Sequence, residues 1–167
     1  MIIDDFSRPF PDTTIGTRWA LLSDGVMGGL SSGSITPVTV AGRPAMRMQG
    51  SVSLENNGGF LQVALDLAPG GGAFDASAWA GVAIDVSGNS EQYGLHIRTT
   101  DLARPWESYR QSFMAKPEWQ ELRLPFDGFL PHRTVTPLNI RRLRRLGIVA
   151  IGRAFDADLR VSGLRLY

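Results

Sequence analysis

Hydrophobic and polar residues alternate along much of this chain with a period of two. In the segment 45–54, methionine, valine and leucine fall on one side, while arginine, glutamine and serine fall on the other. After an apolar start at 2–6, the same period returns at 61–67, 82–86, 95–98, 109–114, 122–124, 147–151 and 159–166. Because alternate side chains of a strand point to opposite faces, this pattern predicts antiparallel strands with one buried and one solvated face.

Turn-forming residues separate these segments. The 19 glycines and 10 prolines are spread over the whole chain, with clusters at 69–72, 87–90 and 126–128. One segment, 137–146, differs because Ile140, Leu143 and Leu146 recur three apart, which predicts a short helix. About nine short strands and this helix predict an all-β fold, a two-sheet antiparallel sandwich or jelly roll. No linker divides the chain, so we expect one domain over residues 1–167.

The composition narrows the function classes. The chain has 17 basic and 16 acidic residues, so no global field attracts nucleic acid. No apolar run approaches the roughly 18 residues that cross a bilayer, and membrane insertion is not expected. Cysteine is absent, which excludes disulfides, thiolate metal ligands and a cysteine nucleophile. The first six residues lack the basic and apolar regions of a signal peptide, so we expect a cytoplasmic protein.

The segment 23–31 reads Ser-Asp-Gly-Val-Met-Gly-Gly-Leu-Ser and contains three glycines. Its spacing fits neither the dinucleotide fingerprint nor the phosphate loop of nucleotide-binding proteins, and it contains no lysine. We therefore interpret the glycines as loop-building residues that let backbone approach backbone closely. Asp24, Met27 and Ser31 are the residues of this loop that we expect to contact a partner.

The segment 53–60 reads Ser-Leu-Glu-Asn-Asn-Gly-Gly-Phe. Asn57-Gly58 predicts a hairpin turn, since both residue types tolerate a positive φ. Glu55, Asn56 and Asn57 also bring carboxylate and amide groups to one end of the sandwich, which suits sugar hydroxyls or a peptide backbone. The alternative is a turn in which the asparagine side chains bond to their own backbone.

A third group of candidates lies in the middle of the chain. His96 alternates with Leu95 and Ile97, so His96 and Arg98 should lie on an outer face, and we expect Tyr109 and Gln111 of a neighbouring strand to join them. Trp106 follows a proline in a loop and is expected to be the exposed tryptophan.

The residues give little support to a catalytic function or to nucleic-acid binding. The two histidines are far apart, so no metal site or catalytic triad is predicted. The pair Asp24 and Glu55 is the one we would consider for glycosidase chemistry, but no supporting cluster of acids and aromatics accompanies it. The arginines at 141, 142, 144 and 145 are interpreted as the solvated face of the short helix rather than as a nucleic-acid site.

These motifs resemble the complex I intermediate-associated protein 30 family. The resemblance rests on Trp19, the segments 23–31 and 53–60, and a later pattern through Tyr93, Arg98-Thr99, Tyr109, Trp119 and Gly147-Ile148. It implies a galactose-binding-like jelly roll, no enzymatic activity, no cofactor, and a chaperone-like role in assembling respiratory complex I or another membrane protein complex. A protein client is therefore the expected partner, and carbohydrate is the alternative. The candidate binding residues are Asp24, Met27, Ser31, Glu55, Asn56, Asn57, His96, Arg98, Trp106 and Tyr109.

Overall fold

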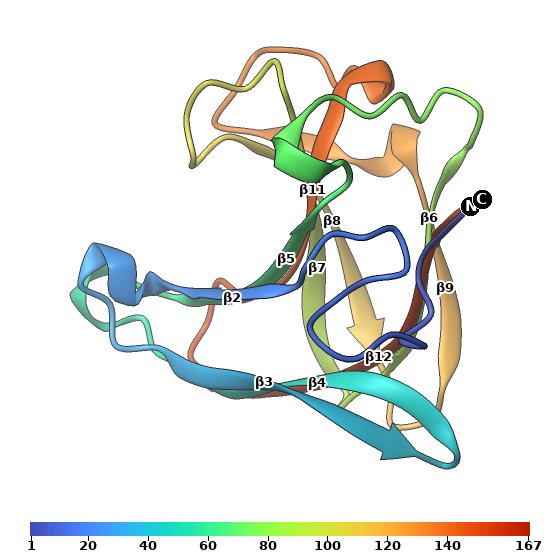
Figure 1. Cartoon of the computed structure of the whole chain (residues 1–167). Coiled ribbons are helices and arrows are strands. Elements are labelled where there is room, and N and C mark those ends of the chain that lie inside the picture. Colours follow the sequence, from blue (N-terminus) through green and yellow to red (C-terminus); the bar gives the residue numbers. More distant parts are fainter.

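The computed structural model shows two six-stranded antiparallel sheets packed face to face (Figure 1). It describes the backbone of residues 1–167 and every side chain except those of Val26, Met27 and Asn57. The first sheet has the order β3-β4-β12-β6-β9, and β1 also pairs with β12. Its strands are β1 (Ile2–Asp4), β3 (Ser32–Val40), β4 (Arg43–Val52), β6 (Gly81–Ser87), β9 (Gln120–Pro125) and β12 (Phe155–Leu166).

The second sheet has the order β10-β8-β7-β11-β5-β2. Its strands are β2 (Ala20–Ser23), β5 (Phe60–Asp66), β7 (Glu91–Thr99), β8 (Ser108–Ala115), β10 (Leu130–His132) and β11 (Leu143–Ile151). Neighbouring strands in both sheets are mostly distant in the sequence, as in a jelly roll. The predicted all-β, two-sheet antiparallel sandwich is confirmed.

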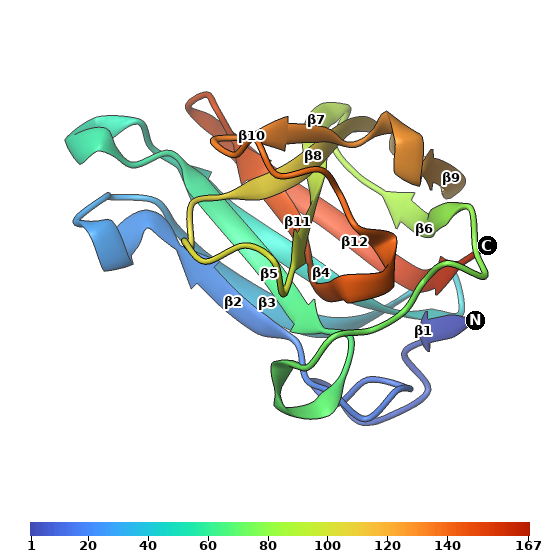
Figure 2. The same cartoon turned by 90° about the horizontal axis from the view of Figure 1, so that it is seen from above.

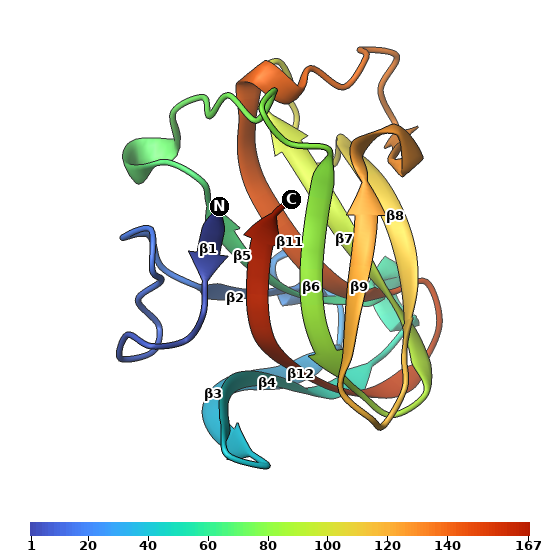
Figure 3. The ribbon, with the colours of Figure 1, turned by 90° about the vertical axis from the view of Figure 1, so that its right-hand side faces the viewer.

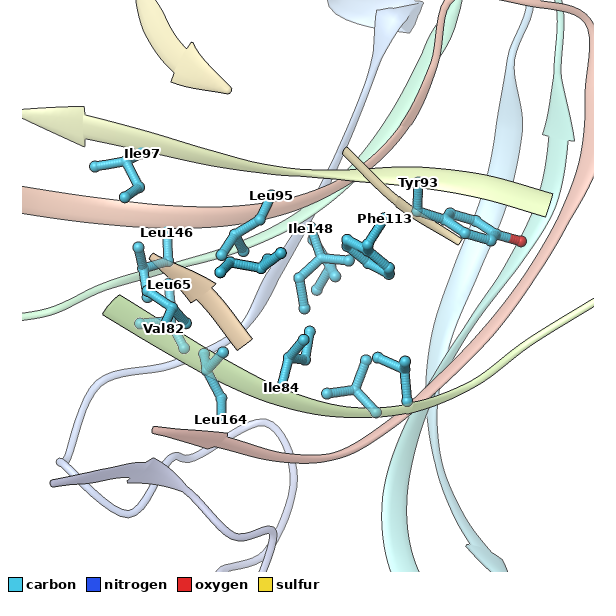
Figure 4. Packing of buried hydrophobic residues seen from close by; sticks show 14 of the residues in the cluster. Leu65, Val82, Ile84, Tyr93, Leu95, Ile97, Phe113, Leu146, Ile148 and Leu164 are labelled. Carbon is cyan, nitrogen blue, oxygen red and sulfur yellow. The ribbon is translucent and has the colours of Figure 1, made fainter. Parts of the chain in front are cut away.

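The core lies between the two sheets and is built from the apolar side of each alternating strand. Leu95 and Ile148 of the second sheet point toward Val82, Ile84 and Leu164 of the first sheet (Figure 4). These five side chains are at most 1% exposed. Burying a side chain of this size contributes roughly 1.5–3 kcal/mol, so the core is what holds the two layers together.

The two ends of the chain lie side by side at one end of the first sheet (Figure 3). The amino group of Met1 donates a hydrogen bond of 2.9 Å to the carbonyl oxygen of Leu166. Strands β4 and β1 pair with successive parts of the same edge of β12. β4 pairs with residues 155–161, and β1 pairs near Leu164. The long β12 thus joins three strands of its sheet.

The helix predicted at 137–146 is wrong in extent. The structure has only a 3₁₀ turn, η5 (Ile140–Arg142), and residues 143–151 form strand β11 at the centre of the second sheet. The other short turns are η1 (Asp24–Met27), η2 (Glu55–Asn57), η3 (Pro69–Gly71) and η4 (Phe126–Gly128). Leu143 and Leu146 are three residues apart although both are buried in one strand, because a β-bulge inserts an extra residue between Leu143 and Arg145. This spacing gave the false indication of a helix.

Three strands were not predicted, and all lie at or near sheet edges. β2 has four residues and β10 has three, which is too short for a visible alternation. β3 has nine residues but is solvated on both sides over much of its length, and it contains Pro37, which sheets tolerate at edges. Within the described part of the chain, no helix has the length and apolar character needed to span a bilayer.

Candidate binding surface

The two glycine-containing loops are joined to each other through Asp24. We call this unit, residues 23–31 with residues 53–60, the loop latch; its two loops lie side by side at one end of the molecule (Figures 1 and 2). The carboxylate of Asp24 accepts hydrogen bonds from the backbone N–H groups of Ser31, Gly59 and Phe60, and from the hydroxyl of Ser31. The Ser31 hydroxyl in turn accepts a bond of 2.9 Å from the N–H of Ser53.

Two glycines of the latch are required because the Asp24 side chain lies against them. A Cβ atom at Gly29 would come within 2.8 Å of the Cβ of Asp24. A Cβ atom at Gly58 would lie 2.8 Å from the Cγ of Asp24 and 2.9 Å from the Cα of Gly29. Neither position has room for a side chain, so the interpretation of these glycines as points of close approach is supported by the geometry.

Asp24 and Ser31 are therefore interior residues of the latch and not surface contacts. Asp24 is 0% exposed and Ser31 is 7% exposed. Burial by itself raises the pKa of Asp24, but the hydrogen bonds from Ser31, Gly59 and Phe60 outweigh it and hold that pKa below its ordinary value. The expectation that Asp24 and Ser31 meet a partner directly does not fit this burial, and Asp24 cannot serve with Glu55 as an accessible glycosidase pair.

The remaining latch candidates are placed as follows. Glu55 and Asn56 are exposed, while the side chains of Met27 and Asn57 lie outside the described residues. The predicted Asn57-Gly58 hairpin is replaced by the turn η2, in which Asn56 has a φ of 55°. Gly58 has a φ of −79°, and the second positive φ of this loop, 136°, falls on Gly59.

Cross-strand pairing places His96 in a row of outward side chains on the second sheet. The Cα partners along this row, from β10 to β2, are Leu130, Arg110, His96, Gly147, Ala64 and Ala20. Leu95 and Ile97, which flank His96, are both 0% exposed in the core, so the predicted outward position of His96 is confirmed. Arg98 lies on the same face, beside Arg145 of β11.

Tyr109 does not share this face, and the prediction that it does is wrong. Tyr109 is the Cα partner of Ile97 and is 0% exposed in the core. Its hydroxyl donates to the carbonyl oxygen of Thr136 at 2.8 Å. Gln111 also follows the inward alternation, so Arg110 and Ser112 take the outward positions that were expected for Tyr109 and Gln111.

The His96 ring lies close to the sheet because Gly94, two residues before it, has no side chain. A Cβ atom at Gly94 would come within 3.2 Å of the His96 Nε2 atom. His96 is consequently only 8% exposed, and burial, together with Arg110 and His132, lowers its pKa to about 3. Next to the ring is a hollow of about 170 Å³ whose lining includes Gly94, His96, Arg110, Ser112 and Arg153.

A larger recess of about 270 Å³ lies elsewhere, between the N-terminal loop and the β3–β4 hairpin. Phe6, Phe10, Pro37 and Pro44 contribute to its walls, and Arg8 is its charged residue. Because Phe6 and Phe10 also pack against the core, we interpret this recess as the seam of a structural cover. The smaller hollow is the better candidate, since several polar and charged side chains converge there.

Sequence reasoning missed a set of apolar side chains on the same outer face. Leu22 opposes Gln62, and Phe60 opposes Ile151, so these three apolar residues point outward near the latch end of the second sheet. None of them belongs to the core cluster or to the partly buried residues packed against it. Further exposed apolar side chains are Met114 on β8 and, in the latch, Leu30 at 55% and Leu54 at 51%. The individual strands gave no signal for this set, because it is assembled from β2, β5, β8, β11 and the latch.

Trp106 lies in the loop between β7 and β8 and is 50% exposed, which confirms it as the exposed tryptophan. The guanidinium of Arg104 lies 5.7 Å from the centre of its ring, an arrangement that favours cation–π attraction. Among the residues whose side chains are described, no group of three or more histidine, aspartate or glutamate side chains is arranged to hold a metal ion.

Known structures with a similar fold include carbohydrate-binding modules. The family 11 module of a cellulosomal cellulase of Clostridium thermocellum matches with a TM-score of 0.78 and 15% identity, over 99% of this chain and 92% of that one. The family 11 module from the same organism in complex with a β-1,3-1,4-mixed-linked tetrasaccharide matches with a TM-score of 0.76 and 16% identity, over 99% and 93%. The family 30 module of another cellulosomal cellulase of Clostridium thermocellum matches with a TM-score of 0.62 and 15% identity, over 83% and 90%. At these identities the likeness shows the fold alone.

Sequence comparison identifies the family. No curated protein sequence matches the chain. The model of the complex I intermediate-associated protein 30 family matches residues 8–161, which is nearly the whole chain and includes both loops of the latch. The chain therefore belongs to the complex I intermediate-associated protein 30 family.

Proposed function

We propose that this protein is a non-catalytic binding module that docks a protein partner on the outer face of the second sheet. The observation that carries the proposal is an apolar group on one outer face, formed by Leu22, which is 37% exposed, and the half-buried Phe60 and Ile151. The exposed Leu54 of the latch lies near it, against Gly59. Apolar side chains that gather on one face and are rimmed by charged residues are typical of protein-docking surfaces. Membership of the family supports a role as an assembly factor for a respiratory, complex I-like, or other membrane protein complex.

The placement of the titratable side chains supports a function without catalysis. Asp24 is enclosed by its hydrogen-bond donors, so its carboxylate is closed to a substrate. His96 is the more deeply buried of the two histidines. The charged groups that act on its pKa are Arg110 and His132, and neither is a carboxylate that could orient the ring as a general base. The Ser31 hydroxyl, which donates to the Asp24 carboxylate, is only 7% exposed, so this pair of a hydroxyl and a base is also closed to a substrate.

Carbohydrate binding is the second candidate, and the similarity to carbohydrate-binding modules favours it. Sugar-binding surfaces commonly use exposed aromatic rings as stacking platforms. On the described outward positions of the second sheet, Phe60 is the one tyrosine, tryptophan or phenylalanine ring, and it lies among aliphatic side chains. This composition supports a protein partner better than a glycan.

The experiment that tests the proposal is affinity capture with crosslinking from a membrane extract of the source organism. Wild-type protein is compared with Leu22→Asp, which puts a charge on the apolar group, and with Val135→Asp, which makes the same kind of change at a fully exposed loop position. We expect wild type and Val135→Asp to recover the same subunits of one membrane complex and Leu22→Asp to lose them. Capture of the same subunits by all three proteins, or recovery of no membrane-complex subunit by wild type, would contradict the proposal.

Calorimetry distinguishes carbohydrate binding from protein docking. Titration with a β-1,3-1,4-mixed-linked tetrasaccharide and other neutral oligosaccharides is expected to give no binding heat at millimolar ligand. Saturable heat that disappears in Phe60→Ser but persists in Val135→Asp would replace the protein-docking proposal with carbohydrate binding.

A further inference from the structure

On the outer face of the first sheet, carboxylates compensate two of the arginines. On the first sheet, Arg47 pairs with Asp158 at 2.8 Å, and Arg165 pairs with Asp85 at 3.0 Å and also with Glu121. Arg47 and Arg165 thus each have a carboxylate partner on their own face, whereas Arg160, the Cα partner of Arg47, donates to the Ser87 hydroxyl.

The outer face of the second sheet has more cations than carboxylates. Arg145 pairs with Asp66, and Arg153 pairs with Glu91. Among the described side chains, Arg98 and Arg110 form no ion pair. Arg98 donates to the carbonyl oxygen of Arg104 at 2.9 Å, and Arg110 donates to the Ser108 hydroxyl at 3.0 Å.

The surroundings of Arg110 raise the energetic cost of leaving its charge without a carboxylate partner. Burial, followed by the nearby charge of Arg133, lowers the pKa of Arg110, and burial followed by Arg110 and Arg133 lowers that of His132. The charged groups that act on Arg110 and His132 are thus of one sign. A half-buried guanidinium beside other cations is stabilised most effectively by a carboxylate, which its planar fork can bind through two hydrogen bonds.

The hollow beside Arg110 provides space for such a group. Its lining includes Gly94, His96, Ser112 and Arg153. His96 is neutral at pH 7, so one of its ring nitrogens carries a proton and can donate without adding a further charge. Arginine, imidazole and hydroxyl groups therefore surround a volume of about 170 Å³ that suits an anionic group of a few heavy atoms.

We propose that this hollow receives a carboxylate side chain from an extended, acidic and apolar segment of the partner protein. The inference rests on the proposed function and adds the chemistry of the partner. The segment lies across the second sheet, its carboxylate bound by Arg110 in the hollow and its apolar side chains on Leu22, Phe60 and Ile151.

The neighbouring apolar residues favour a peptide over other anions. The outward row next to the His96 row contains Ser112, Gly94, Val149, Gln62 and Leu22, so the hollow and the apolar group are adjoining parts of one surface. A free phosphate would leave the apolar group uncovered. An acidic glycan would present hydroxyl groups to it.

The test uses the full chain and a fluorescent hexapeptide of alternating glutamate and leucine, measured by fluorescence anisotropy. A peptide with glutamine in place of each glutamate, an oligogalacturonate and inorganic phosphate are the comparison ligands. We expect the glutamate peptide to bind, the glutamine peptide to bind about tenfold more weakly, and Arg110→Gln to produce a similar loss. Arg123→Gln, which removes one charge from the outer face of the first sheet, is expected to leave binding unchanged.

The outcomes separate this inference from the proposed function. Equal binding of both peptides, or an unchanged affinity in a folded Arg110→Gln variant, would overturn the acidic-segment inference. If membrane-complex subunits are then still captured by wild type and lost in Leu22→Asp, the protein-docking proposal stands without it. Preferential binding of oligogalacturonate would assign the hollow to an acidic glycan, and displacement of the peptide by phosphate at low millimolar concentration would assign it to a free anion; either result overturns the inference.

Discussion

The carboxylate of Asp24 lies 3.2 Å from the backbone nitrogen of Phe60, which is 36 residues further along the chain. This hydrogen bond and its neighbours join two loops that would otherwise diverge at the end of the sandwich. It also starts β5 at a defined position, so the outward side chain of Phe60 is placed opposite Ile151. The latch is therefore connected directly to the apolar part of the candidate binding surface.

The first prediction concerns Asp24. In Asp24→Ala, the N–H groups of Ser31, Gly59 and Phe60 lose a charged acceptor in a buried site, and we expect the free energy of unfolding to fall by about 3 kcal/mol. Urea denaturation measures the change. Asp127→Ala, at an exposed position, is the control and should change stability by less than about 0.5 kcal/mol. Equal stability of the two variants would show that the latch does not depend on this carboxylate.

The second prediction concerns the close approach of the loops. Gly58→Ala brings a Cβ atom within 2.8 Å of the Asp24 side chain, so we expect a loss of about 2 kcal/mol in unfolding free energy. Gly72→Ala is the matched control, because an added Cβ there meets nothing within 4 Å and its φ is −69°. Thermal melts of both variants provide the measurement, and a Gly58→Ala protein as stable as wild type would refute the steric argument.

The third prediction is a pH dependence due to His96. Its pKa is about 3 in the folded protein because of burial, Arg110 and His132, against about 6.5 for an unperturbed histidine. Between these values the unfolded chain binds a proton that the folded protein excludes, so stability falls as the pH falls. From pH 6.5 to 4.5 this one group accounts for up to about 2 kcal/mol.

Denaturant titrations at several pH values check this dependence. His96→Gln should flatten the decline of stability between pH 6.5 and 4.5, where carboxylates with lowered pKa remain ionised. His132→Gln should flatten it less, because His132 is more exposed. Parallel pH profiles for wild type and His96→Gln would rule out His96 as the source.

The fourth prediction concerns Tyr93, whose hydroxyl bridges two parts of the fold. It donates to the Asn89 side chain at 2.7 Å and accepts from the N–H of Asp158 at 2.9 Å. Tyr93→Phe removes both bonds while keeping the ring, and we expect a loss of about 1–2 kcal/mol in unfolding free energy. Tyr167→Phe, at the chain end, serves as the control, and a similar loss in both would contradict the role of the bridge.

Predictions that depend only on the alternation within one strand succeeded, and those that depend on how strands pair did not. Local alternation was sufficient for strands such as β4 and for the outward position of His96, because the period of two is a property of each strand by itself. Tyr109 was misplaced because its face depends on how β8 aligns with β7, and a shift of one residue reverses every side chain. The extent of β11 was misread because a bulge changed the spacing of its leucines.

The sequence by itself determined the all-β architecture, and its two glycine motifs were specific enough to indicate the family. Both properties depend on local order along the chain, which alternation and motif spacing record directly. Only the tertiary structure decided that Asp24 is enclosed, that Arg98 and Arg110 have no carboxylate partner among the described side chains, and that Leu22, Phe60 and Ile151 share one face. These relationships arise where strands distant in the sequence pair, and pairing register is set by the packing of the whole sandwich.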